Sequence, residues 1–172
     1  MKFSVEEAFK VLQNTPLVLK TLFSNISEEW IINNEGTNTW SPYEILAHLI
    51  VSEKNIWMYR AKTIIESNEE VIFKMSSSSP KDYDNYGSPI LHVLDEFKKI
   101  RKENMEILKS YDLNEELLVK KAIHPSMGQV TLKQLLSAWV VHDLNHTKQI
   151  ARVMAKQYVN EMGPWVEHII VK

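Results

Sequence analysis

Cysteine is absent from the 172 residues of this chain. Disulfide bonds, thiolate metal sites and a cysteine nucleophile are therefore excluded. Glycine and proline are also scarce, with four and six residues respectively. Because long stretches contain neither residue, the sequence favours an all-helical fold over a sheet rich in turns.

Long hydrophobic runs are missing as well. No apolar run approaches the roughly 18 residues of a membrane-spanning helix, and acidic residues stand near the N-terminus, where a signal peptide would be apolar. We therefore expect an intracellular, cytoplasmic protein that does not insert into a membrane.

An excess of positive charge is missing too. The formal net charge of -2 disfavours sequence-independent nucleic-acid binding, which needs a basic face. The nearest basic cluster alternates with glutamates and is expected to be a solvated helix face. It consists of Lys98, Lys99, Arg101 and Lys102.

What is present is enough apolar material, 44% of the residues, for one domain spanning residues 1–172. Helical apolar periodicity recurs in four long segments, near 4–23, 41–66, 88–111 and 131–158. Each begins at a residue suited to an N-cap, namely Ser4, Ser41, Ser88 and Thr131. The pattern predicts an all-α, four-helix bundle. Pro16, inside the first segment, should kink that helix or split it near Thr15.

The connections between these helices are predicted to contain no strands. Ser67 to Gly87 is rich in serine and charged residues, and we expect an irregular crossover between the second and third long helices. Its aromatic residues, Phe73, Tyr83 and Tyr86, are candidates for holding it to the bundle. Gly163 and Pro164 should stop the last helix. The apolar tail after them should pack on the bundle or on a second subunit, and it contains Trp165, Ile169, Ile170 and Val171.

The most informative segment is the last helix. Its buried stripe follows steps of three and four residues through Leu132, Leu135, Trp139, His142, His146, Gln149 and Val153. Two histidines at positions i and i+4 stand one turn apart, close enough to share one ion. A third histidine, His48, lies in the apolar first half of the second long helix and should also be interior.

Two interpretations of these histidines are open. Three neutral imidazoles leave one tetrahedral position free on a metal ion, the arrangement of a catalytic site, and they suit Zn, Ni, Cu or Fe(II). Alternatively, they are core residues satisfied by hydrogen bonds. Ser52 and Gln149 are candidates to contact a bound water or a substrate, and the carboxylates of Glu53 and Asp143 are candidate acceptors for the ligands' second N–H groups. His92, His124 and His168 are expected to have no functional role.

With these residues identified, the sequence resembles the DinB-like family (the DinB/YfiT superfamily of metal-dependent enzymes). The resemblance rests on segments spread over most of the chain: Trp40-Ser41-Pro42, the A-H-L-I around His48, Glu96-Phe97, Arg101 to Asn104, His124-Pro125, Gly128, Thr131-Leu132, the W-V-V-H-D-L-N-H run with Gln149, Met154 to Tyr158 and Gly163-Pro164-Trp165.

The resemblance implies a four-helix bundle of unusual topology, often dimeric, that holds one divalent metal ion, typically Zn or Ni. The ligand positions of the family fall on His48, His142 and His146. Better-understood relatives are thiol-dependent transferases and isomerases, and others are described only as hydrolases. Many relatives carry another histidine at the position of Ser52, so the role of that histidine does not transfer to this chain.

Two functions are consistent with these features. In the first, the metal ion activates a low-molecular-weight thiol or water for attack on a small electrophilic substrate. In the second, the chain is a non-catalytic, dimeric, metal- or ligand-binding bundle with a stress-related role. Neither involves nucleic acid, and both fit a homodimer. The sequence contains no obvious general base, so catalytic residues other than the metal ligands are not assigned.

Overall fold

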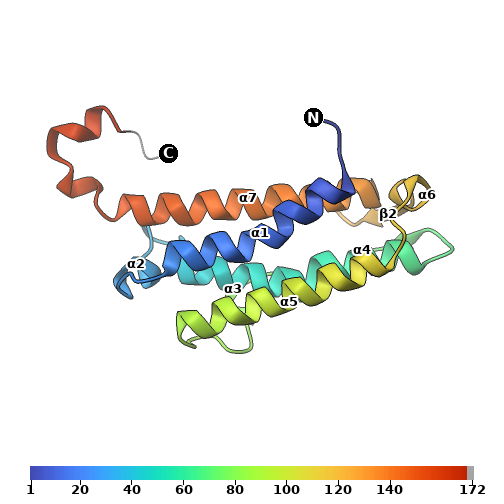
Figure 1. The fold of residues 1–172 in the computed structure, drawn as a ribbon, viewed down its shortest axis with the longest axis horizontal. Helices are drawn as coiled ribbons and strands as arrows, with labels where there is room; N and C mark the ends of the chain where they lie inside the picture. The colour runs from blue at the N-terminus through green and yellow to red at the C-terminus, as the bar shows by residue number, and fades with distance from the viewer. Residues whose placement is uncertain (170–172) are drawn as a thin grey trace.

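The computed structural model describes residues 1–169. The long helical elements are α1 (Val5–Phe23), α3 (Pro42–Ser52), α4 (Met58–Glu66), α5 (Ile90–Ser110) and α7 (Leu132–Lys156). A π-helical turn, η1 (Glu53–Trp57), joins α3 to α4, so the second long helix runs unbroken to Glu66, as predicted. The fold is the predicted four-helix bundle (Figure 1). The short helices α2 (Glu29–Ile32) and α6 (Glu115–Leu118) lie in the connections.

The helix starts follow the local sequence closely. Ser41 and Glu44 form a reciprocal capping box at the start of α3, and Thr131 and Gln134 form a second one at the start of α7. Each box satisfies two backbone N–H groups that have no partner within the helix. At α5 the boundary is one residue later than predicted, because Pro89, rather than Ser88, is the N-cap.

Pro16 does not split the first helix. It lies buried inside α1, which continues to Phe23. The last helix also differs from the prediction at its end: α7 stops at Lys156, before Gly163 and Pro164, and the 3-10 turns η3 (Val159–Glu161) and η4 (Gly163–Glu167) follow it.

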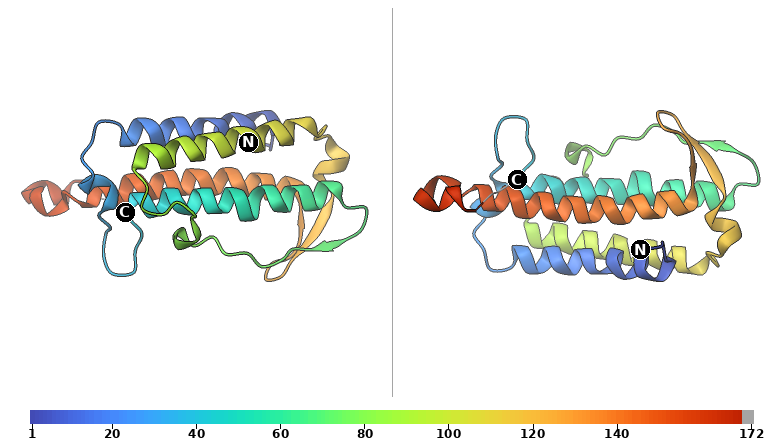
Figure 2. Two further views of the ribbon diagram at one scale, coloured as in Figure 1. Left: turned by 90° about the horizontal axis from the view of Figure 1, so that it is seen from below. Right: turned by 90° about the horizontal axis from the view of Figure 1, so that it is seen from above.

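Helix direction explains the long crossover. In Figure 1, α3–α4 and α5 run in the same direction, whereas α1 and α7 run in the opposite one. Two parallel neighbours cannot be joined by a tight turn, because the chain must return along the bundle before the next helix begins. The crossover makes this return along the side of the bundle, as Figure 2 shows. The helix α1 packs against α5 and α7, and α3 packs against the same two helices.

The prediction that the connections contain no strands is wrong. A small three-stranded sheet contains β1 (Val71–Ile72), β2 (Lys121–His124) and β3 (Gly128–Thr131). The strands β2 and β3 form an antiparallel hairpin, and β1 pairs in parallel with β2, with Val71 opposite Ala122. Gly128 begins β3 with a φ of 73°, a conformation that glycine adopts without strain. The sheet attaches the start of the crossover to the segment that leads into α7.

The crossover is held down as its aromatic residues suggest. Phe73 and Tyr83 are almost fully buried, and the 3-10 turn η2 (Pro80–Asp82) packs on α3. The Tyr83 hydroxyl donates to Glu96 on α5 at 2.7 Å. Tyr86 is exposed, but its hydroxyl donates to Glu44.

The tail does not pack on the bundle over its described length. Trp165 and Ile169 keep 67% and 54% of their surface exposed, and Figure 1 shows the tail extending beyond the end of α7. Ile170 and Val171 lie outside the described residues, and packing against a second subunit stays a prediction. Among residues 1–169, no helix is long and apolar enough to cross a membrane.

Candidate metal centre

Three histidines from two helices converge between α3 and α7. Each of His48, His142 and His146 offers one ring nitrogen, and these nitrogens all lie within 4.8 Å of one another. The Nε2 atoms of His48 and His142 are 3.1 Å apart, and the ring centroids of His142 and His146 are 4.3 Å apart. The structure therefore brings together the three predicted ligands, with His48 lying 94 or more residues before the other two in the sequence.

Two of the three rings are held by hydrogen bonds on their far side. The Nδ1 of His48 lies 2.5 Å from the backbone oxygen of Ser78, in the crossover. The Nδ1 of His146 lies 2.8 Å from Oε1 of Gln149, one turn further along α7. Because both oxygens only accept, each Nδ1 carries the proton and donates. The Nε2 atoms of His48 and His146 are then left with free lone pairs, as metal ligation requires.

Burial keeps these imidazoles neutral. It lowers the pKa of His48, an effect opposed by the bond to Ser78 and reinforced by His142. Burial, followed by the proximity of His142 and His48, lowers the pKa of His146 to about 4. Neutral imidazole is the form that binds a metal, so these two rings are in the ligating state at neutral pH.

The cluster fits a divalent cation better than it fits a self-sufficient set of core residues. Ligands at about 2.0–2.1 Å in a tetrahedral arrangement are separated by about 3.3–3.4 Å, close to the 3.1 Å between the two Nε2 atoms. Facing lone pairs at that distance repel unless a cation or a proton lies between them. In addition, the Nδ1 of His142 is buried without a hydrogen-bond partner among the described residues, whereas an ordinary core histidine would be satisfied.

Tryptophans enclose the imidazoles. Trp40, just before α3, lies over His48 with ring centroids 4.9 Å apart. Trp57, in the π-helical turn, meets His142 edge-on at 5.0 Å and stacks on Trp139 at 5.8 Å. Apolar walls of this kind exclude water and strengthen electrostatic interactions within the site.

A second buried polar cluster lies beside the histidines. Arg101 of α5 donates to Asp143 at 2.6 Å, to Glu53 at 2.6 Å and to the backbone oxygen of Leu12. Trp139 also donates to Glu53, at 2.8 Å. Burial acts to lower the pKa of Arg101, but Glu53 and Asp143 outweigh it and raise the pKa. The prediction of a solvated basic face is therefore wrong for Arg101, although Lys98, Lys99 and Lys102 are exposed.

The predicted acceptors for the ligand N–H groups are not the ones observed. Glu53 binds Arg101, Trp139 and Asn104. An oxygen of Asp143 stands 4.0 Å from the Nδ1 of His142, beyond hydrogen-bonding distance. Gln149, predicted to face a water or a substrate, instead orients His146. The Ser78 carbonyl had no signal in the sequence, because any residue can supply a backbone oxygen. Ser52 lies with its hydroxyl 3.5 Å from His48 Nε2.

The other histidines lie apart from this cluster. His124 ends β2, is buried, and accepts a hydrogen bond from the backbone N–H of Ser126 at 3.2 Å. His92 and His168 are exposed. Within the described part of the chain, none of these three belongs to the cluster of His48, His142 and His146.

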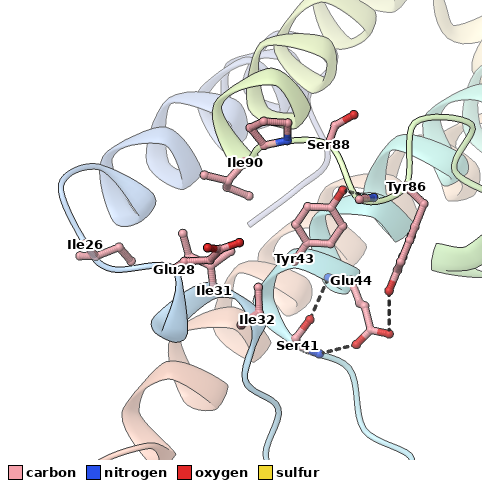
Figure 3. A pocket seen from close by; sticks show the side chains of 12 residues that line it. Ile26, Glu28, Ile31, Ile32, Ser41, Tyr43, Glu44, Tyr86, Ser88 and Ile90 are labelled. Carbon is pink, nitrogen blue, oxygen red and sulfur yellow. Dashed lines mark hydrogen bonds between the residues drawn. The ribbon is translucent and has the colours of Figure 1, made fainter.

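A separate pocket of about 680 Å³ opens at the N-terminal end of α3. One part of it is lined by Ile26, Ile31, Ile32 and Ile90 (Figure 3). Within it, Glu44 accepts from the backbone N–H of Ser41 and from the Tyr86 hydroxyl. The residues that line this pocket do not include the three histidines.

Comparisons with known proteins identify the family of the chain and two solved structures of similar fold. The DinB superfamily profile matches residues 12–150. Among solved structures, YfiT from Bacillus subtilis, described as a probable metal-dependent hydrolase with an unusual four-helix bundle topology, aligns with a TM-score of 0.74. It is 17% identical, with 91% of this chain and 90% of that chain covered. TT2238, a four-helix bundle protein, aligns with a TM-score of 0.57 at 17% identity, covering 86% and 98% of the two chains. These two likenesses show the fold. Among proteins with curated functions, none matches the sequence.

Proposed function

Because the chain belongs to the DinB superfamily, we propose that it is a metal-dependent enzyme whose three-histidine site activates a thiol or water. The ligands are His48, His142 and His146, and the metal is one divalent ion, Zn or Ni. The substrate is a small electrophilic molecule, and the nucleophile is a low-molecular-weight thiol or water. The observation that carries the proposal is that the Nε2 atoms of His48 and His142 face each other at 3.1 Å. The ring of His48 is oriented by its hydrogen bond to Ser78.

The residues around the ligands prepare the site before any ion binds. Ser78 and Gln149 fix the direction in which His48 and His146 point, so less conformational freedom is lost on ligation. Trp40 and Trp57 limit access of bulk water.

The neighbouring charges also favour a cation. One guanidinium and two carboxylates are buried together beside His142, since Arg101, Glu53 and Asp143 are each at most 1% exposed. This cluster carries a net negative charge in a region of low dielectric constant, and a divalent ion at the histidines would offset it.

A divalent ion held by three neutral imidazoles would supply a Lewis acid with a free position, which lowers the pKa of a bound thiol or water. The thiol arm is supported by the family resemblance found in the sequence. The water arm is supported by the description of YfiT as a probable metal-dependent hydrolase. In both arms the chain provides imidazole ligands, two of them with fixed ring orientations, and tryptophan rings packed against them.

Cobalt substitution tests whether the free position is accessible. We expect cobalt-loaded protein to develop a thiolate-to-metal absorption band when a small thiol such as 2-mercaptoethanol is added, and we expect His142→Ala to lack it. The enzymatic proposal would be contradicted if the absorption spectrum of the cobalt-loaded protein did not change when thiol is added and if activated esters and amides were not hydrolysed above background. That outcome would favour the non-catalytic bundle, in which the ion only stabilises packing.

A further inference from the structure

Among residues 1–169, one arginine is left without an anionic partner. Of the three arginines, Arg101 pairs with Glu53 and Asp143, and Arg152 pairs with Glu35. Arg60, on α4, makes no hydrogen bond or ion pair with any of residues 1–169. Its Nε is buried without a partner, as are the Nε atoms of Arg101 and Arg152, so Arg60 differs from these two in lacking a carboxylate partner among the described residues. Burial lowers the pKa of its guanidinium. A half-buried cation without a counter-charge is costly, and an anion from outside the chain would reduce that cost.

The surroundings of Arg60 hold the guanidinium in place without neutralising it. Its central carbon lies 5.2 Å from the ring centroid of Phe73, a cation–π contact. Phe73 in turn meets His124 edge-on at 6.3 Å. The pKa of His124 is lowered by burial and then by Arg60, and an imidazole offers no negative charge in either protonation state. Planar guanidinium groups fixed in this way are suited to bidentate binding of a carboxylate.

The π-helical turn places Arg60 on the same side of the helix as the metal centre. Arg60 stands eight residues after Ser52, and η1 lies between them. A π-helical turn takes up about one extra residue. Residue i+8 therefore points in about the direction of i+7 in a regular α-helix, within about 20° of residue i. Ser52, one turn after His48, is at the metal centre, so Arg60 lies on the same face about 12 Å further along the axis.

The crossover also contacts both Arg60 and the three-histidine centre. Phe73 contacts Arg60, and Ser78, five residues later, accepts the hydrogen bond of His48. Five extended residues span at most about 17 Å. Arginine side chains on a helix lean toward its N-terminus, which for Arg60 is the direction of His48. The side chains of Arg60 and His48 therefore both face the crossover, at a separation that a small molecule can bridge.

We propose that Arg60 binds the carboxylate of the small molecule that reacts at the three-histidine centre. The inference rests on the proposed function and deepens it, because it assigns a chemical class to the ligand: an organic acid whose thiol or electrophilic group reaches the metal while its carboxylate meets Arg60. The acid is either the thiol cosubstrate or the electrophile. Arg60 is an anchoring residue that does not take part in bond making.

The test compares acids with alcohols of the same length. Mercapto acids from 3-mercaptopropionate to 6-mercaptohexanoate and thiol-free acids from butanoate to hexanoate, each with the alcohol of matching length, are titrated calorimetrically into zinc-loaded and chelator-stripped protein. The variants are Arg60→Met, Arg60→Lys and, as a control, Lys62→Met, which removes the same charge two residues away. Metal content and helicity are recorded for every sample.

We expect wild-type protein to bind the best acid about tenfold to hundredfold more tightly than its alcohol, the usual gain from a charged, bidentate hydrogen bond. Arg60→Met should abolish that preference with metal content unchanged, Arg60→Lys should keep part of it, and Lys62→Met should keep all of it. A preference seen only for the mercapto acids assigns the carboxylate to the thiol, and one shared by the thiol-free acids assigns it to the electrophile.

Two results would overturn the assignment of Arg60: equal affinity for acid and alcohol at every length, or a preference that survives Arg60→Met. Titrations of chelator-stripped protein distinguish failure of the Arg60 proposal from failure of the three-histidine metal proposal. If wild-type protein binds no zinc, the metal proposal fails, while acid binding that is weaker but still dependent on Arg60 would uphold the anion site.

Discussion

Two buried polar clusters lie next to each other in this bundle, and they differ in how completely they are satisfied. In the Arg101 cluster, both carboxylates are bonded, with Asp143 bound by Arg101 and Glu53 bound by Arg101, Asn104 and Trp139, although the Nε of Arg101 has no partner in the described chain. In the histidine cluster, two Nε2 atoms face each other and the Nδ1 of His142 has no partner in the described chain. Both clusters use side chains from α7 and the α3–η1 helix, and the Arg101 cluster also uses α5.

The difference distinguishes buried polar residues that stabilise the fold from buried polar residues that a ligand would complete. A buried network whose members satisfy one another needs nothing from solution, and its loss is felt as instability. A buried group with unused hydrogen-bonding capacity is costly unless a ligand completes it. The same contrast holds between Arg101, which has two carboxylate partners, and Arg60, which has none within residues 1–169.

Breaking the satisfied cluster should have the largest effect. Arg101→Met would leave Glu53 and Asp143 buried without a cation, and we expect the free energy of unfolding to fall by about 3–5 kcal/mol. Urea denaturation followed by circular dichroism measures the change. The exposed neighbour provides the control, since Lys102→Met should change stability by less than about 0.5 kcal/mol. Similar values for the two variants would mean that the network does not hold the helices together.

Emptying the unsatisfied cluster should have a smaller effect that depends on metal. For wild-type protein with free zinc at about 100 times its dissociation constant, chelation should lower the unfolding free energy by about 2.7 kcal/mol. His48→Ala should unfold at the same urea concentration with or without zinc, because the site is gone and the bundle remains. A chelator effect of equal size in His48→Ala would place the stabilising ion elsewhere.

Removing one orienting residue should weaken the site without emptying it. In Gln149→Leu, the Nδ1 of His146 loses its acceptor, and we expect zinc affinity to fall about tenfold to hundredfold, as is usual when such partners are lost. Competition with a chromophoric chelator measures this affinity. Asn145→Ala, an exposed change on the same helix, should bind zinc like wild type. An undiminished affinity in Gln149→Leu would show that burial alone orients His146.

The smallest effect concerns pH in metal-free protein. His146 has a pKa of about 4 when folded, against a normal value of 6.5. Below pH 6.5 the unfolded chain takes up a proton that the folded chain binds only near pH 4. Stability should therefore fall as the pH drops across that window, and His146 should have no effect above it. His146→Gln should show a shallower fall in urea titrations, and identical pH profiles for variant and wild type would contradict the low pKa.

Local chemistry in the sequence was sufficient to predict the helices. The capping boxes at Ser41 and Thr131 need residues only three positions apart, and both form as expected. The strands were missed because β1 has two residues and pairs with β2 some fifty positions away. A pairing of that kind depends on where the crossover lies in three dimensions, which periodicity does not encode.

The candidate site likewise combines features that local sequence predicts with features that depend on the three-dimensional arrangement. The converging histidines were predictable, because helical spacing puts His142 and His146 on one face and His48 on another buried helix. Arg101 was misread, since its sequence neighbours are lysines and only its place in the apolar stripe hinted at burial. Ser78 and Arg60 carried no signal, because one acts through a backbone oxygen and the other depends on a π-helical turn.

Metal content tests the central claim most directly. Protein purified without a histidine tag or chelator is analysed for zinc, nickel and other divalent metals, alongside His48→Ala and His142→Ala. The account predicts about one divalent ion per chain in wild type, as expected for a three-histidine site with an open position, and its loss in both variants. No ion in wild type, even after reloading with zinc or nickel, would contradict the account and leave the three histidines as polar residues of the core.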